Sequence, residues 1–411
     1  MRHLGKPAFD ELRSGAGTLL GALLGMMIGI SALPYYSFGI FLSAIESGEH
    51  WSRTEIAFAQ TVWALALACA SPAVGFLIDR FGFRRPVGLS FLLMALSQLA
   101  IAYFARSPIA FIALYALMAL SGAATSPLPF AKLVAARFTK ARGIALGITL
   151  AGTGVATFIA PRFLAEIIAA HGWRGGYLAL ALTVAIVAPI VLLLAKGTVQ
   201  TDAATGAEAK AGVSFREACR GRIFWQLNIA FGVVTLASAG LIAHMVPIMR
   251  QSGASPADAA AVISWVGLSV VIARLTIGLL VDLLPIRTVA AGVFAFTSFG
   301  IVALSTNGVS AAPLTALGLG FALGAEVDLM GYCTARYFGF RDYGSIYGVQ
   351  YGISIIGVAL SPAWMGWLAG DNSYALVLVI AAVGTAIGAV MALALPREKG
   401  LPIAGTQTEP A

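Results

Sequence analysis

Two apolar runs, separated by about half the chain, end in the same pattern of a glycine followed four residues later by an aspartate. The first reads Gly75-Phe-Leu-Ile-Asp79 and the second reads Gly278-Leu-Leu-Val-Asp282. The first copy continues into a loop that holds three arginines. A pattern that recurs after long apolar runs indicates a duplicated chain whose halves both cross a membrane.

The apolar runs are long enough to span a bilayer. The chain has 411 residues, of which 59% are hydrophobic and 11% charged, whereas a soluble domain carries about 25% charged residues. A spanning helix needs about 20 apolar residues. We therefore predict an all-α membrane protein with twelve transmembrane helices. The predicted spans are 17–40, 55–77, 87–104, 108–131, 143–168, 175–196, 222–249, 258–281, 288–306, 311–334, 344–369 and 374–395.

Further matches between the halves define the repeat. Gly143-Ile-Ala-Leu-Gly147 corresponds to Gly344-Ser-Ile-Tyr-Gly348, and each opens a predicted helix. The long polar interruption between the halves is typical of a linker between two pseudo-symmetric six-helix bundles. The predicted regions are a first bundle at 1–196, a linker at 197–221 and a second bundle at 222–411.

Basic residues are distributed unevenly over the predicted loops. Twenty of the 26 Lys and Arg residues lie in segments on the same side as both termini. Four lie in loops on the other side, and two, among them Arg274, fall within predicted helices. Because Lys and Arg are enriched in cytoplasmic loops, we expect both termini in the cytoplasm and a location in the plasma membrane, the inner membrane of a bacterium.

The same composition argues against several other classes. The formal net charge of +8 is spread between apolar segments, so we expect no nucleic-acid partner. Cys69, Cys219 and Cys333 are far apart, and with four histidines they show no metal-type spacing. No nucleotide-binding loop and no nucleophile–base pair is apparent. We expect no enzyme activity, metal or cofactor, and we expect the lipid bilayer, protons and a small molecule as partners.

The twelve predicted helices, the linker and the loop Gly75-x-x-x-Asp79-Arg80-x-Gly82 together resemble the major facilitator superfamily. The resemblance covers essentially the whole chain. It implies two six-helix bundles around a central cavity and transport by rocking between two states of access.

Shorter stretches resemble bacterial monocarboxylate-transporter-like proteins and their sister group, the oxalate–formate exchangers. They are Pro34-Tyr-Tyr-Ser-Phe-Gly-Ile-Phe41, Trp51-Ser-Arg53, Gly143-Ile-Ala-Leu-Gly147, Gly172-Trp-Arg174, Ala325-Glu-Val-Asp-Leu-Met-Gly331 and Arg336-Tyr-Phe-Gly339. The resemblance implies that Arg274 binds a substrate carboxylate. Tyr35 and Val270 stand where animal relatives carry a lysine and an acidic residue tied to proton coupling. The eleventh helix lacks the second cation of the exchangers, which favours a monocarboxylate over a dianion.

Arg274 also stands out by its position. It lies eight residues before Asp282, which is about 12 Å inside the end of its predicted helix. A guanidinium at that depth faces a cavity or a partner, and its planar fork suits a carboxylate. Substrate binding and a structural ion pair with another helix are both open interpretations.

Two acidic residues lie at a similar depth in the tenth predicted helix. Glu326 and Asp328 are two residues apart, so they face different sides of the helix. Either could carry a proton or pair with Arg274 at rest, and Glu326 could instead hydrogen-bond a neighbouring helix. His244 could relay protons or be a buried structural histidine. Asp328, Glu326 and His244 are therefore the proton-coupling candidates.

The remaining candidates are polar residues in the spans and the repeated loop motif. The predicted substrate-binding residues are Arg274, Tyr35, Tyr36, Tyr351, Gln350 and Asn228. The predicted gating residues are Asp79, Arg80, Gly75, Gly82, Arg84 and Asp282. A carboxylate such as Asp79 can sit against the N-terminus of a helix from the other half, where the helix dipole favours it. We expect such a contact to form in one state and break in the other.

These features predict a secondary transporter of a small organic anion, in the first place a proton-coupled monocarboxylate symporter that functions as a monomer. An organic anion exchanger and a drug or metabolite exporter of the same fold are the alternatives within transport. Ala160-Pro161 replaces the Gly-Pro of many exporters, which weakens the second alternative. A membrane receptor without net flux is the alternative outside transport.

Overall fold

The computed structural model describes residues 6–49, 51–195, 212–369 and 374–397, and most of these residues are helical. The first half contains α1 (Lys6–Ser14), α2 (Ala16–Ile28), α3 (Leu33–Glu49), α4 (Arg53–Phe81), α5 (Arg84–Phe104), α6 (Pro108–Gly122), η1 (Ala123–Thr125), α7 (Pro127–Arg137) and α8 (Arg142–Leu194). The second half contains α10 (Phe215–Arg220), α11 (Arg222–Gln251), α12 (Pro256–Leu283), α13 (Ile286–Asn307), η2 (Gly308–Ala311), α14 (Ala312–Phe338), α15 (Tyr343–Ala369) and α16 (Ala375–Leu393). The predicted linker is described only from residue 212 onward.

The helices account for the predicted number of membrane passes. Ten stretches of the described residues are long and apolar enough to cross a membrane. One of them, 286–338, contains two helices, α13 and α14, joined by η2. A shorter apolar helix, Arg142–Ala156, begins α8, which is interrupted at Gly172 by a positive φ of 70°. Counting these parts separately gives twelve passes and confirms the all-α membrane fold.

Two predicted spans are broken where the sequence analysis expects continuous helices. The span 17–40 is divided between α2 and α3. The hydroxyl of Thr125 accepts a hydrogen bond from the backbone amide of Ile30 at 2.9 Å, so the break leaves this buried amide paired. The span 108–131 is divided by η1, and the helix restarts at Pro127, a residue suited to the first turn.

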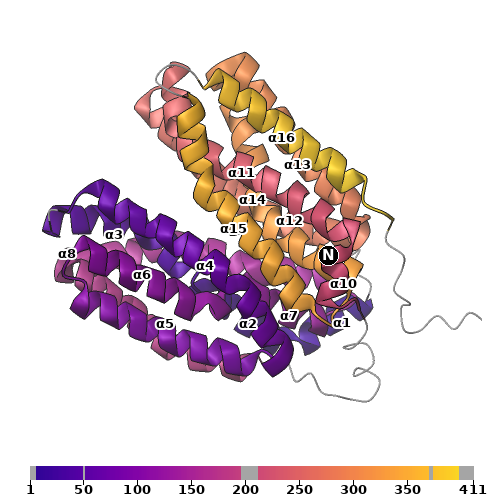
Figure 1. Cartoon of the computed structure of the whole chain (residues 1–411), viewed down its shortest axis with the longest axis horizontal. Coiled ribbons are helices and arrows are strands. Elements are labelled where there is room, and N and C mark those ends of the chain that lie inside the picture. The colour runs from indigo at the N-terminus through magenta and orange to yellow at the C-terminus, as the bar shows by residue number, and fades with distance from the viewer. Residues whose placement is uncertain (1–5, 50, 196–211, 370–373, 398–411) are drawn as a thin grey trace, which may run out of the picture.

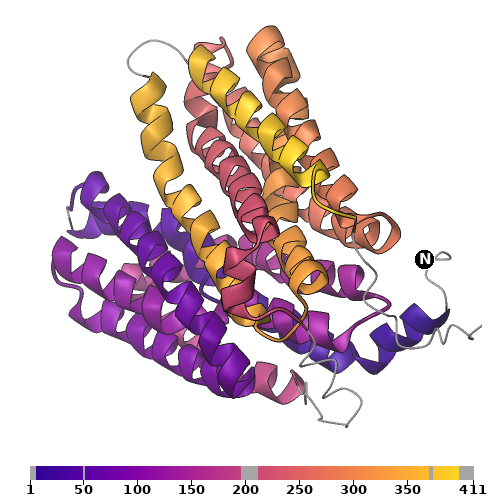
Figure 2. The ribbon, with the colours of Figure 1, turned by 45° about the vertical axis from the view of Figure 1, so that its right-hand side comes forward.

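The two halves form separate bundles that are tilted against each other. Figure 1 shows the indigo-to-magenta first half and the red-to-yellow second half meeting near α7 and α10 and diverging toward α3 and α16. The turned view in Figure 2 shows the same divergence. We call the region around α7 and α10 the converging end. There α15 packs along α4, and α12 packs along α8.

Glycines bring these helix pairs together backbone to backbone. A Cβ atom at Gly75 of α4 would overlap the carbonyl group of Gly344 in α15. On the other side, a Cβ atom at Gly143 of α8 would overlap the carbonyl oxygen of Gly278 in α12. Small residues at such positions allow membrane helices to approach closely. We call these contacts the α4–α15 seam and the α8–α12 seam.

Candidate functional site

A cavity of about 450 Å³ lies between the two halves. Both halves supply its walls, and the seams close the converging end. The residues of the first half that bear aromatic or polar groups are Ser31, Tyr35, Tyr36, Gln60, Thr61, Trp63 and Thr153. Those of the second half are Arg274, Glu326, Tyr351 and Ser354. The cavity therefore brings together four of the six predicted substrate-binding residues.

Helix α12 places Arg274 on the cavity wall, two turns before Asp282. Its Nη1 atom donates a hydrogen bond to the carbonyl oxygen of Leu150 in α8 at 2.6 Å. The same atom lies 3.9 Å from a carboxylate oxygen of Asp328 in α14. Within the described part of the chain, Nε of Arg274 and both carboxylate oxygens of Asp328 have no hydrogen-bond partner. Because a guanidinium has five donor hydrogens, Arg274 retains donors for a ligand.

The second acidic residue of α14 faces another neighbour. Glu326 lines the cavity and accepts a hydrogen bond from the hydroxyl of Thr235 in α11. Asp328 is not among the residues that line the cavity, but it lies beside Arg274, which does line it. The two carboxylates thus face different sides of α14, in line with their two-residue spacing.

The wall contributed by the first half is aromatic. The ring centroids of Tyr35 and Trp63 lie 5.3 Å apart, and those of Tyr35 and Tyr36 lie 5.0 Å apart in an edge-to-face arrangement. Aromatic rings of this kind offer a large apolar surface with polar edges. The sequence analysis missed Trp63 because it lies in an apolar run, where a cavity-facing tryptophan cannot be told from a lipid-facing one.

One polar contact crosses the cavity, and two predicted binding residues lie away from it. The hydroxyl groups of Tyr351 in α15 and Ser31 between α2 and α3 are 3.0 Å apart. Gln350 accepts a hydrogen bond from Thr334 at 2.6 Å, within the second half. Asn228 donates to a backbone carbonyl one turn earlier in its own helix, at 2.8 Å. Neither Gln350 nor Asn228 lines the cavity.

His244 has a partner at each ring nitrogen. Its Nε2 atom lies 2.9 Å from the carbonyl oxygen of Pro362, so this nitrogen must donate. Its Nδ1 atom lies 2.9 Å from the hydroxyl of Tyr374. These contacts tie α11 to α15 and to the start of α16, and His244 is not among the residues that line the cavity.

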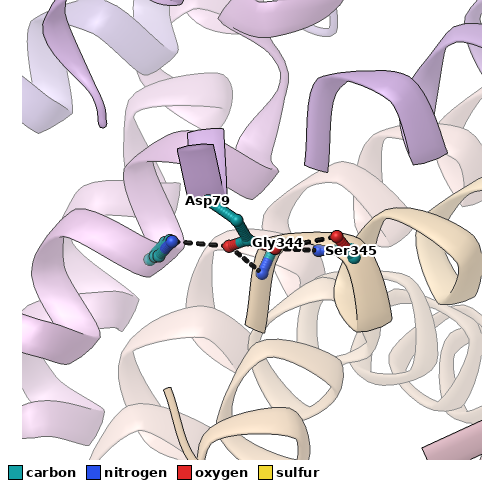
Figure 3. A network of polar contacts seen from close by, with 4 residues as sticks. Asp79, Gly344 and Ser345 are labelled. Atoms are coloured by element: carbon teal, nitrogen blue, oxygen red, sulfur yellow. Dashed lines mark hydrogen bonds and ion pairs between the residues drawn. The ribbon is translucent and has the colours of Figure 1, made fainter. Parts of the chain in front are cut away.

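At the converging end, Asp79 binds the first turn of a helix from the other half, as Figure 3 shows. Its carboxylate accepts hydrogen bonds from the backbone amides of Gly344 and Ser345 and from the Ser345 hydroxyl, each at 2.8 Å. Lys132 of α7 pairs with the same carboxylate at 2.6 Å. The inter-half contact that the sequence predicts for Asp79 is therefore present. It caps the N-terminus of α15, where the helix dipole favours negative charge.

Asp282 makes the equivalent contact on the opposite seam. It accepts hydrogen bonds from the backbone amides of Gly143 and Ile144, in the first turn of α8, at 2.9 and 3.1 Å. Arg142 lies beside them, with its guanidinium carbon 5.2 Å from the ring centroid of Phe340 of the other half. Each half thus contributes one carboxylate and one helix N-terminus to the closure.

Three further predicted gating residues, Arg80, Gly82 and Arg84, make their contacts inside the first half, whereas Gly75 lies on the α4–α15 seam. Gly82 ends α4 with a φ of 72°, a conformation that favours glycine. The guanidinium of Arg80 lies over the rings of Phe76 and Phe81, 6.0 and 5.5 Å from their centroids. Arg84 donates to the carbonyl oxygen of Leu192 at 2.9 Å. These contacts brace the loop that follows Asp79.

Comparison with known proteins assigns the chain to the family that its sequence resembles. The family model of the Major Facilitator Superfamily matches residues 24–325. Monocarboxylate transporter 13 of Bos taurus is 25% identical over 289 residues, which cover 70% of this chain and 66% of that protein. Monocarboxylate transporter 12 of Mus musculus is 23% identical over 274 residues, which cover 58% of this chain and 56% of that protein. The chain thus spans two thirds or less of the length of these relatives.

Solved structures share the fold at low sequence identity. The E. coli fucose:proton symporter FucP superimposes with a TM-score of 0.70 at 15% identity and covers 93% of this chain and 98% of its own. The proton:xylose symporter XylE superimposes with a TM-score of 0.71 at 12% identity, with 92% and 94% covered. A structure of FucP in the outward conformation gives a TM-score of 0.69 at 15% identity, with 92% and 97% covered.

Proposed function

This chain belongs to the major facilitator superfamily and is a multi-pass membrane transporter rather than an enzyme, and we propose that it carries a small monocarboxylate together with protons by alternating access. The names of similar proteins support this proposal. The relatives in sequence are named monocarboxylate transporters, and the neighbours in fold are named proton symporters. The stronger support is the chemistry of the cavity.

The observation that carries the proposal is the position of Arg274. Its guanidinium is buried on the cavity wall, held by one carbonyl hydrogen bond and by a loose contact with Asp328. A buried cation with spare donors is an attractive site for a carboxylate. A hydrogen bond to a charged group contributes roughly 1.5–3 kcal/mol, which corresponds to about a tenfold to a hundredfold change in affinity.

The opposite wall favours an apolar substrate body. Tyr35, Tyr36 and Trp63 can contact an organic group while its carboxylate binds Arg274. Among the described residues that line the cavity, Arg274 is the one cation. A second carboxylate on the substrate would therefore lack a partner, so a monocarboxylate should bind better than a dicarboxylate of similar size.

Asp328 can couple the substrate to a proton. Its buried carboxylate and the substrate carboxylate compete for the same guanidinium, 3.9 Å from Asp328 in this structure. A proton on Asp328 neutralises the resting partner and leaves Arg274 to the substrate. Glu326 is the second carboxylate placed to take up a proton from the cavity.

We assign the converging end to the cytoplasmic side, because the basic loops lie there and basic loops are enriched in the cytoplasm. Both termini would then be cytoplasmic in a bacterial inner membrane. The seams and the carboxylates Asp79 and Asp282 close that side, and we therefore infer an outward-facing state of a carrier that functions as a monomer. Opening would require both carboxylates to leave their helix N-termini.

The test of substrate binding compares variants at one position. Purified Arg274→Ala in detergent should lose carboxylate binding, whereas Arg274→Lys should keep part of it, because the charge remains and the planar fork is lost. Arg106→Ala, at an exposed site away from the cavity, serves as the matched control. Thermal unfolding without ligand checks that each protein is folded. Unchanged carboxylate affinity in folded Arg274→Ala would remove this residue from the site.

The test of coupling uses proteoliposomes. Asp328→Asn should still exchange internal for external substrate and should no longer accumulate it in response to a pH gradient. Glu326→Gln is the matched variant two residues away on α14. If both variants retain gradient-driven accumulation, the proton site lies elsewhere, and His244 would be examined next.

A further inference from the structure

In the first half, the short helix α1 holds the loop that leads into α8. Glu11 of α1 accepts hydrogen bonds from the backbone amides of Thr139, Lys140 and Ala141 at 2.8, 2.9 and 3.0 Å. It also accepts one from the Thr139 hydroxyl at 3.1 Å. Partial burial opposes ionisation, but these hydrogen bonds outweigh it and lower the pKa of Glu11. Glu11 therefore binds the loop as a carboxylate.

In the second half, the end of the linker holds the corresponding loop before α15. Asp342 accepts a hydrogen bond from the backbone amide of Phe215, the first residue of α10, at 2.7 Å. The amide of Val213 donates to the carbonyl oxygen of Phe338 at 2.8 Å, and Gly212 forms a bridge with Gly339. The contact reverses the roles seen in the first half, because here the loop supplies the carboxylate.

Both anchored loops lead directly into the helix ends that close the converging end. The amides bound by Glu11 end at Ala141, and those bound by Asp282 of the other half begin at Gly143. Asp342 likewise lies two residues before Gly344, which binds Asp79. These amides can donate to a carboxylate of the other bundle only when the backbone of their loop is ordered. Ordering the backbone of one residue costs about 1–2 kcal/mol of conformational entropy.

We propose that Glu11 and Asp342 are positioning residues for gating. They keep the loops before α8 and α15 ordered, so that Asp282 and Asp79 can close the converging end. Through them α1 and α10 set the balance between the two states of the carrier. Neither residue lines the cavity, so neither takes part in binding the substrate. The proposal concerns the conformational equilibrium and does not depend on the identity of the substrate.

Two engineered cysteines report the two states separately. Ser71→Cys lies buried on the α4–α15 seam and should react with a maleimide only when the converging end opens. Thr61→Cys lines the cavity and should react in the state described by this structure. Each is introduced into a chain in which Cys69, Cys219 and Cys333 have been replaced.

Glu11→Ala should raise the labelling rate at Ser71→Cys by roughly threefold to tenfold and lower the rate at Thr61→Cys. Glu11→Gln, which keeps one accepting oxygen, should lie between Glu11→Ala and the parent. Asp342→Ala should act in the same direction, and its effect should multiply with that of Glu11→Ala because the two sites are on separate seams. Glu55→Ala is the matched control, since Glu55 caps the far end of α4 with Ser52.

The reciprocal change distinguishes positioning from general loosening. If Glu11→Ala raises labelling at both cysteines, the contact only stabilises the fold, and the proposal is wrong. Equal labelling in Glu11→Ala, Glu55→Ala and the parent would also overturn it. Glu11→Gln provides the same test with a smaller perturbation if the alanine variant does not fold.

Discussion

The two halves of the molecule are alike where they touch each other and different where they enclose the cavity. At the converging end each half offers an aspartate to a helix N-terminus of the other, and each seam is built on glycine. In the cavity, the second half supplies Arg274 and Glu326, whereas the first half supplies Tyr35, Tyr36 and Trp63. The glycine–aspartate contacts are therefore present in both halves, whereas the residues that line the cavity differ between the halves.

This difference has a mechanical reason. Closure requires the two halves to fit together along both the α4–α15 seam and the α8–α12 seam, so both copies of the glycine–aspartate pattern are needed. Recognition of an asymmetric substrate with one charged end needs a charged group on one wall and an uncharged wall opposite it. A symmetric pair of arginines would leave one buried cation without a partner. The comparison leads to three predictions, which run from the largest expected effect to the smallest.

Adding a side chain to a seam should abolish transport in either half. In Gly75→Val and Gly143→Val the added atoms would overlap a backbone carbonyl of the other half, so the converging end cannot close. We expect the rate of substrate uptake in proteoliposomes to fall more than about tenfold, because overpacking costs about 1–3 kcal/mol or more. Gly39→Ala, where nothing lies within 4 Å of an added Cβ, is the control. Normal uptake by either valine variant would contradict the seam model.

Replacing Asp79 or Asp282 by asparagine should slow uptake to different extents, which tests how alike the two inter-half contacts are. Asp79→Asn loses the ion pair with Lys132 as well as the charge on its hydrogen bonds, whereas Asp282 accepts two backbone hydrogen bonds. Hydrogen bonds to charged groups contribute about 1.5–3 kcal/mol. We expect slower uptake in both variants, with the larger loss in Asp79→Asn, and ligand-induced thermal stabilisation should persist in both. Loss of binding in folded Asp79→Asn would contradict a pure gating role.

The bridge across the cavity should have the smallest effect. Tyr351→Phe removes the contact with Ser31 at 3.0 Å and keeps the ring in place. A neutral hydrogen bond contributes about 0.5–1.5 kcal/mol, so the balance between the two states should change by at most about tenfold. Tyr103→Phe, at an exposed tyrosine, is the control in the same labelling assay. A complete loss of transport in Tyr351→Phe would assign this hydroxyl to the substrate site.

The sequence was sufficient for features that depend on periodicity and depth. Apolar length predicts twelve passes, and the place of Asp79 at the end of a predicted helix indicates a contact with a helix N-terminus of the other half. The position of Arg274 within its helix predicts burial, which the structure confirms. Each of these follows from spacing along a single helix or from a copy of it.

Features that depend on the packing of distant helices were not predictable in this way. The choice of Asp328 rather than Glu326 as the neighbour of Arg274 depends on the rotation of α14 relative to α12. Trp63 carries no signal that separates the cavity from the lipid. Glu11 lies in a short polar segment, and only the fold brings it to the loop before α8.

The glycine seams also bear on the temperature dependence of transport. Immobilising a flexible side chain at an interface costs about 0.5–1.5 kcal/mol of entropy, and a glycine has no side chain to immobilise. The glycine positions of the seams therefore add no side-chain entropy cost to closure, and we expect the hydrogen bonds to Asp79 and Asp282 to supply favourable enthalpy. Cooling should populate the closed form, and release of these two carboxylates should then set the activation enthalpy of turnover.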